Sequence, residues 1–261
     1  MVALVAREAA GGVFDVATAV RAWGTSPEST RARIRGLVAR GWVRRLRRGL
    51  YWLLPLDVSA GEGDVVEDTW ALAERAFAPC YVGGWSAAHH WGLTEQLFRT
   101  TFVVTSSSVR ERQLMIAETE FRVAKVPSER VARGAVLWRG AARVHVSDRE
   151  LTIVDALADP SWVGGFRHLA EIVRAYRGGD AWKPARLIAR LAEFDRGAPY
   201  KRLGYIAEML SPIPDDLVRE CLAHRSAGVI ALDPAVEERG HILNRWGVRV
   251  NVSLDDLRAS A

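Results

Sequence analysis

The sequence contains little cysteine and little lysine. Only Cys80 and Cys221 occur among 261 residues, and their spacing fits neither a metal site nor a redox CxxC motif, so we expect two buried free thiols in a reducing cytoplasm. The three lysines are Lys125, Lys183 and Lys201, and none has an acidic residue two positions earlier. The (D/E)xK motif of many metal-dependent nucleases is therefore absent, although other metal geometries stay open.

The motifs of several large enzyme classes are also missing. There is no GxxxxGK(S/T) phosphate loop, no GxGxxG after a strand and no HExxH, and GWSAA lacks the second glycine of a nucleophile elbow. His89 and His90 are adjacent, so on a helix their side chains point about 100° apart, which favours core or capping roles over metal binding. We therefore expect a protein that is not an enzyme and that has neither a metal site nor a cofactor.

Long apolar runs are absent as well. No uninterrupted run approaches the ~20 residues that a membrane helix needs, and residues 1–16 show no basic leader before an apolar stretch. The sequence therefore predicts a soluble cytoplasmic protein without a membrane partner. At ~100–200 residues per domain, its length suggests two domains.

Acidic residues are missing from one conspicuous stretch. Residues 31–48 contain eight arginines and no acid. Residues 1–55 hold ten arginines against three acids, a formal charge of +7, which leaves −2 for the other 206 residues because the whole chain carries +5. A basic segment attached to a slightly acidic body is typical of nucleic-acid-binding proteins.

The basic segment has the signals of two consecutive helices. Apolar residues recur at helical spacing over 13–24 and end at Gly24. Thr25 or Ser26 can then cap a second helix, and Pro27 suits its first turn. The sequence predicts a helix, a short turn and a helix.

The second helix has one apolar face and one face of small and basic residues. Thr30, Ile34, Leu37 and Val38 share the apolar face, whereas Arg31 lies nearer that packed side and is a weaker candidate for binding. Small residues between arginines allow a helix to approach a DNA groove while the arginines reach phosphates or guanine edges. The second face carries Ser29, Ala32, Arg33, Gly36 and Arg40, with Arg35 near its edge.

A basic hairpin follows this helix. Trp42, Leu46, Leu50 and Trp52 flank an Arg47-Arg48-Gly49 turn, a pattern typical of a short β-hairpin. Helix, turn, helix and hairpin is the order of a winged helix-turn-helix, and we assign this domain to residues 1–56. A solvated charge run is the plainer alternative, but eight arginines without acidic partners favour an anionic ligand. A module that grips an acidic protein partner is the second alternative.

The remaining residues predict an α+β body. Residues 57–64 are typical of a linker, and residues 65–261 should form a body that is mixed α/β to about 160 and mainly helical after it. Ser147 is the expected cap of one helix, and Ser86 the expected start of another. The expected strands are 101–107, 120–126, 135–140, 142–147 and one within 245–254; the expected helices are 65–77, 81–96, 149–160, 166–177, 183–195, 200–210 and 214–223.

The order of four segments resembles the AbiEi family, the antitoxins of bacterial toxin–antitoxin and abortive-infection operons. The segments are RGWVRRLRRGLYWLLPL, YVGGWSAAHHWGLTEQ, SDRELTIVDALADP and YKRLGYIAEML. The resemblance implies a transcriptional repressor whose winged helix binds inverted repeats in double-stranded DNA upstream of its own operon. It also implies a C-terminal region that counteracts, directly or indirectly, a nucleotidyltransferase-like toxin.

The resemblance also suggests site residues. Lys201, Arg202 and Tyr205 are candidates for antitoxin function, but Leu203, Ile206 and Leu210 in the same segment fit a packed helix face, which is the favoured interpretation. With the helix residues identified above, the candidate DNA contacts are Ser29, Arg33, Arg35, Arg40, Arg44, Arg45, Arg47 and Arg48.

Overall fold

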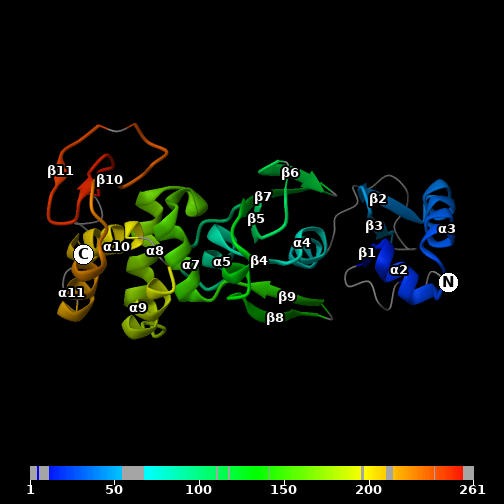
Figure 1. Ribbon diagram of the computed structural model, residues 1–261, viewed down its shortest axis with the longest axis horizontal. Helices are drawn as coiled ribbons and strands as arrows, with labels where there is room; N and C mark the ends of the chain where they lie inside the picture. Colours follow the sequence, from blue (N-terminus) through cyan, green and yellow to red (C-terminus); the bar gives the residue numbers. More distant parts are fainter. Residues whose placement is uncertain are drawn as a thin grey trace. The chain divides into compact units, whose positions relative to one another are not determined.

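The protein folds into separate sheets and helices, and the expected α+β class is confirmed at that level (Figure 1). The computed structural model describes residues 5, 12–54, 68–109, 111–116, 118–140, 142–194, 197–209, 214–237 and 239–254. The expected linker at 57–64, and the domain boundary placed there, lie outside these residues. Contacts divide the chain into two compact units, Met1–Val82 with Arg99–Val146, and Gly83–Phe98 with Ser147–Ala261.

The N-terminal module of the first unit combines a small antiparallel sheet with two helices. Its buried core is formed by side chains from all five elements or their ends, among them Phe14, Ile34 and Val43. The sheet has the order β1-β3-β2. The elements are β1 (Val13–Asp15), α2 (Val16–Trp23), α3 (Pro27–Ala39), β2 (Val43–Arg47) and β3 (Leu50–Leu53).

Two details of this module correct the sequence-based expectation. Val13–Asp15 is a strand rather than the start of a helix, because it pairs with β3 and Asp15 then caps α2 by accepting a hydrogen bond from the Thr18 N–H at 2.7 Å. Val38, expected on the packed face of α3, is 37% exposed. The expected turn is present, with Gly24 ending α2, Ser26 accepting from the Ser29 N–H at 3.3 Å, and proline in the first turn of α3.

A six-stranded mixed sheet forms the rest of the first unit. The expected strands at 101–107, 120–126, 135–140 and 142–147 are present, and α4 (Thr69–Phe77) packs on the sheet. Cys80–Val82 and Gln113–Ile116 are two further strands, and the first overlaps the start of the helix that the sequence predicts over 81–96. The sheet order is β6-β7-β5-β4-β9-β8. Its strands are β4 (Cys80–Val82), β5 (Thr101–Thr105), β6 (Gln113–Ile116), β7 (Thr119–Lys125), β8 (Ala135–Arg139) and β9 (Ala142–Val146), with α6 (Ser128–Val131) before β8.

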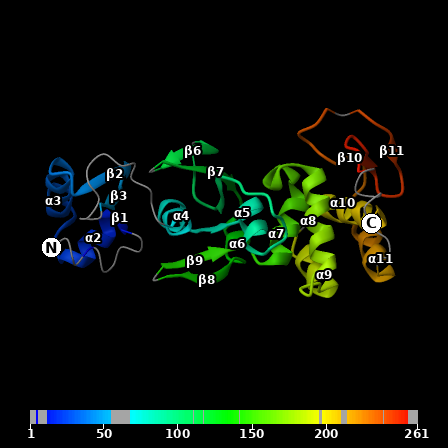
Figure 2. The ribbon, with the colours of Figure 1, turned by 180° about the vertical axis from the view of Figure 1, so that it is seen from behind.

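The second unit is mainly helical, and Figure 2 shows α7, α8 and α9 side by side. A small sheet of order β10-β12-β11 lies near its C-terminal end. None of the helices that the structure describes is both long and apolar enough to cross a membrane. The elements are α5 (Gly84–His90), α7 (Arg149–Ala158), η2 (Pro160–Val163), α8 (Phe166–Gly178), α9 (Pro184–Ala192), α10 (Ala198–Met209), α11 (Asp215–His224), β10 (Ile230–Ala231), β11 (Ile242–Leu243) and β12 (Val248–Arg249).

Three expectations for this unit are wrong in detail. Helix α5 begins at Gly84 rather than Ser86, because Tyr81 and Val82 before it are drawn into strand β4. His89 and His90 are exposed in its last turn, so of the core and capping roles expected for them the core role is wrong. The cap of α7 is Asp148, which accepts from the Leu151 N–H at 2.7 Å, whereas Ser147 lies one residue too early.

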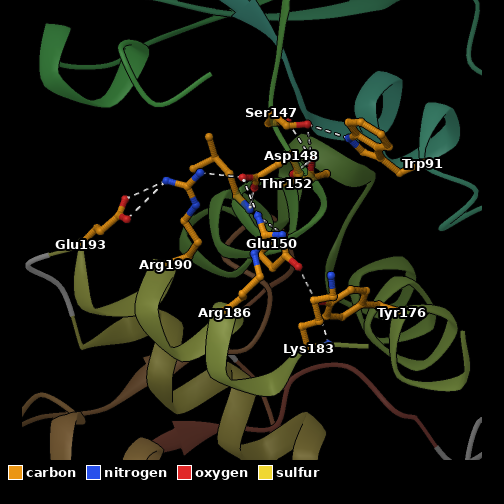
Figure 3. A network of polar contacts seen from close by, with 11 residues as sticks. Trp91, Ser147, Asp148, Glu150, Thr152, Tyr176, Lys183, Arg186, Arg190 and Glu193 are labelled. Carbon is orange, nitrogen blue, oxygen red and sulfur yellow. Dashed lines mark hydrogen bonds and ion pairs between the residues drawn. The ribbon is translucent and has the colours of Figure 1, made fainter. Parts of the chain in front are cut away.

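A polar network fastens α7 to α8 and α9 (Figure 3). Arg190 of α9 contacts Asp148 at 2.5 Å, and Arg186 lies 3.7 Å from the buried Glu150. The Tyr176 hydroxyl of α8 donates to Glu150 at 2.7 Å. Burial, reinforced by Glu150, raises the pKa of this tyrosine. These contacts give Asp148 and Glu150, at the start of α7, partners inside the unit.

The two cysteines are free and buried, as expected. Burial, with the charge of Glu220 nearby, raises the pKa of Cys221 to about 12, and burial together with Glu74 also raises the pKa of Cys80. Because the thiolate is the reactive species, neither thiol should react with Ellman's reagent in the native protein at pH 8, and both should react in guanidinium chloride. If the native protein released one equivalent of thionitrobenzoate from the reagent, one of the two thiols would not be buried.

Candidate nucleic-acid interface

Most side chains on the outward face of α3 are small, and arginines flank this face on both sides. Thr30, Ile34 and Leu37 are buried against the module core. Ala32 and Ala39 are exposed, and at 100° per residue they lie opposite those buried side chains. Beyond its first turn, where the exposed Glu28 lies on this face, the part of α3 farthest from the core therefore has little side-chain bulk.

The arginines of α3 fall into two rows. Arg31 and Arg35 are four residues apart and lie on one flank, whereas Arg33 and Arg40 lie on the other flank, about 160° away for Arg33. All four are exposed. Arg31, expected nearer the packed side, is exposed, because α3 meets the core through Thr30 and Leu37 and leaves Val38 and Arg31 outside it.

The hairpin separates two adjacent arginines by strand alternation. Arg45 is paired with Tyr51, and Arg44 with Trp52, in the antiparallel register of β2 and β3. Successive side chains of a strand point to opposite faces, and Val43, on the same face as Arg45, belongs to the core beside α3. Arg45 therefore lies on the face toward α3, and Arg44 on the other face.

A groove of about 690 Å³ joins one arginine row of α3 to the hairpin. We call it the arginine groove; it is lined by Arg31 and Arg35 from α3 and by Arg45 and Arg48 from the hairpin, with Asp15 and Tyr51. Tyr51 stacks on Phe14 of β1 with ring centroids 5.8 Å apart, which fixes that wall. Gly49 turns the chain here with φ of 83°, a conformation that favours glycine.

Two of the predicted contact residues are placed differently, and the side chain of a third is not described. Ser29 belongs to the helix cap, since its hydroxyl accepts from Ser26 at 3.1 Å. Arg40 is folded back on its own helix, where its Nε donates to the Gly36 carbonyl at 2.9 Å and its guanidinium lies 5.7 Å from the Trp42 ring centroid. The backbone of Arg47 belongs to β2, but its side chain lies outside what the structure describes.

Among the residues that the structure describes, Asp15 is the one acid that lines the arginine groove. Burial raises its pKa, but hydrogen bonds from Thr18 and the charges of Arg21 and Arg75 outweigh that effect, so the pKa of Asp15 is lowered from its ordinary value. The carboxylate is therefore ionised at neutral pH and reduces the positive potential of the groove.

The candidates for antitoxin function are buried in the second unit. Lys201, Arg202 and Tyr205 are between 0% and 6% exposed. The Lys201 Nζ donates to the Gly228 carbonyl at 2.6 Å. Lys201 and Arg202 hold the segment around β10 against α10, and the burial of all three side chains leaves little of them for a partner to contact. Leu203 and Ile206 are buried, as the packed-face interpretation expects, whereas Leu210 lies outside the described residues.

Arg202 joins three elements through backbone carbonyls. Its Nη1 donates to Leu157 O at 2.8 Å and to Ala158 O at 3.2 Å, which satisfies the C-terminal end of α7. Its Nε and Nη2 donate to Leu232 O at 2.9 Å and Ala231 O at 3.0 Å. Burial lowers the pKa of Arg202 to about 10, partly offset by nearby acids, so the guanidinium stays charged at neutral pH.

Metal ligands do not cluster in the part of the chain that the structure describes, where no group of three or more His, Cys, Asp or Glu side chains is placed to hold an ion.

Comparisons with known proteins give a fold and no family. No family model matches the sequence, and no curated protein matches it. Among solved structures, the RV2827C protein from Mycobacterium tuberculosis is similar, with a TM-score of 0.62 over 99% of this chain and 92% of that one, at 16% identity. At this identity the likeness concerns the fold alone.

Proposed function

We propose that residues 13–53 form a winged helix-turn-helix that binds double-stranded DNA. The order β1, α2, α3, β2, β3 supports this assignment, with α3 as the recognition helix and the β2–β3 hairpin as the wing. The observation that carries the proposal is the arginine groove, where four arginines from two elements line one hollow. Arginine pairs with phosphate through a planar fork, which makes such a hollow suited to a nucleic-acid backbone.

The dimensions of α3 suit the major groove. A helix with its side chains is about 10–12 Å wide, and the major groove is about 12 Å wide. Ala32 and Gly36 would allow α3 to approach the base edges, and the two arginine rows would reach the backbones on either side. This supports base readout by α3 and backbone contact by the wing.

We propose further that the protein is a transcriptional repressor of its own operon and an antitoxin against a nucleotidyltransferase-like toxin. The support is the resemblance in four segments along the chain, together with the attachment of a basic N-terminal module to a larger body of opposite formal charge. The body would act on the toxin through surfaces other than the buried Lys201, Arg202 and Tyr205.

A gel shift tests the DNA-binding proposal. The purified full-length protein is titrated onto ~200 bp of DNA from upstream of its own operon and onto a scrambled duplex of equal composition. We expect retardation of the upstream duplex at a protein concentration at least about tenfold lower than for the scrambled one. Equal retardation would leave only non-specific binding, and no retardation would favour an acidic protein partner.

Replacing Asp15 by asparagine should tighten DNA binding. Asparagine caps helices as well as aspartate does, so the change removes a negative charge from the arginine groove and leaves the cap in place. A charge at about 4 Å in water is worth roughly 1 kcal/mol, so affinity should rise by about two- to fivefold. Fluorescence anisotropy at low salt measures the gain, with Asp216→Asn, an exposed acid of the second unit, as the control. Equal affinity for wild type and Asp15→Asn would place the bound duplex outside the groove.

A further inference from the structure

We infer that the arginine groove clamps the backbone of one DNA strand, and that Arg33 contacts the opposite strand of the same half-site. The inference rests on the proposed DNA binding and adds a division of labour between the two flanks of α3. Under this inference Arg31 contacts DNA, although the sequence places it nearer the packed side of α3. Arg44, which the sequence predicts as a DNA contact, does not contact DNA.

The first support is convergence from two elements on one hollow. Arg31 and Arg35 lie one turn apart on α3, so their Cβ atoms are about 5–6 Å from each other. Arg45 and Arg48 face them from the hairpin across the same groove. Because the four guanidinium groups surround one hollow, they are placed to contact consecutive phosphates of one strand. They are not placed to contact phosphates of both strands on opposite sides of a helix.

The second support is the rigidity of the hairpin wall. Arg45 lies directly opposite Tyr51 in the strand register, and Tyr51 is stacked on Phe14 of the buried core. The wall is thus formed before DNA arrives, so little ordering of the backbone is needed on binding. Arg44 lies on the other face of β2, with Trp52, and points away from the groove.

The third support is the angle between the rows of α3. Arg33 lies about 160° from both Arg31 and Arg35 around the helix axis. When α3 lies in the major groove with Ala32 toward the bases, side chains so far apart reach toward the two opposite backbones. A single phosphate segment cannot satisfy both rows.

Ethylation interference on the upstream duplex tests the inference, with each strand end-labelled in turn. Phosphates whose ethylation blocks binding of the wild-type protein are mapped first, and the patterns are compared within one half-site because the proposed operator is an inverted repeat. When a substitution removes a phosphate contact, ethylation of that phosphate no longer blocks binding. The variants are Arg31→Ala with Arg45→Ala, and Arg33→Ala, with Arg44→Ala as the matched control in the hairpin.

We expect the Arg31/Arg45 variant to lose interference on one strand only, and Arg33→Ala to lose it on the other strand. Affinity should fall roughly tenfold for each groove arginine removed, and less than about twofold for Arg44→Ala. Thermal melting followed by circular dichroism checks that each variant is folded.

Failure of the proposed DNA binding and failure of this inference give different results. A wild-type protein that forms no complex with either duplex overturns the proposed function and this inference together. A specific complex whose interference pattern is lost from both strands alike, or is unchanged in the Arg31/Arg45 variant, overturns the inference alone. So does an Arg44→Ala variant that weakens binding as strongly as Arg45→Ala.

Discussion

A variant with alanine at all four arginines of the arginine groove should bind duplex DNA at least about a thousandfold more weakly than the wild type. A hydrogen bond to a charged group contributes roughly 1.5–3 kcal/mol, which is tenfold or more in affinity for each contact. The effects of four residues in one groove are not additive, so the full product is not expected. The positions are Arg31, Arg35, Arg45 and Arg48.

Anisotropy titrations of a labelled duplex at fixed salt measure this loss. A matched variant removes the same formal charge from exposed positions of the second unit, and it should keep its affinity within about threefold, because exposed ion pairs on the surface contribute little. Equal losses in the two variants would mean that total charge, rather than the groove, controls binding. The control positions are Arg167, Arg219, Arg239 and Arg245.

Replacing Arg202 by methionine should lower the free energy of unfolding of the second unit by about 3–5 kcal/mol. Methionine keeps much of the volume but donates to none of the four carbonyls that Arg202 binds. The end of α7 and the strand β10 would then carry buried acceptors without donors, and α7 would lose a cation at the negative end of its dipole.

Urea denaturation followed by tryptophan fluorescence checks this expectation. Arg219→Met is the control, because Arg219 is exposed on α11 and contacts Asp216 at the surface; its unfolding free energy should change by less than about 0.5 kcal/mol. If Arg202→Met unfolded at the same urea concentration as the wild type, Arg202 would not join α7 to the C-terminal segment. DNA affinity should be unchanged in both variants.

Local signals in the sequence were sufficient for most helices and for the longer strands. Ser26 and Pro27 mark the start of α3, and the apolar periodicity from 166 onward predicts α8 to α11 within a few residues. Caps and periodicity act within one or two turns of chain, so they can be read without knowing the tertiary structure.

The short strands could not be found in this way. Val13–Asp15, Cys80–Val82 and Gln113–Ile116 have three or four residues each, too few to show an alternating pattern. They are strands because partners pair with them, β3 for the first and β5 with β9 for the second. Such pairing depends on residues distant in sequence and overrides local propensity.

The sequence predicts which residues form the candidate interface, but it does not predict how their side chains are arranged in space. The arginines of α3 and the hairpin were identified from their number and spacing, yet their division between two faces needs the register that pairs Arg45 with Tyr51. The place of Arg31 in the arginine groove was not predicted, although its i, i+4 relation to Arg35 is a usable signal. For Arg202 the sequence offers a basic residue in a helical segment and no sign of the carbonyls that it binds.

The salt dependence of DNA affinity tests the central claim most directly. The dissociation constant of the full-length protein for the upstream duplex is measured over a range of salt concentrations. Each phosphate contact contributes about −0.9 to the slope of log affinity against log salt, so the four groove arginines alone predict a slope of about −3.6 or steeper. A slope near zero, or a steep slope that is the same in the variant lacking all four groove arginines, would contradict the claim that the arginine groove holds DNA phosphates.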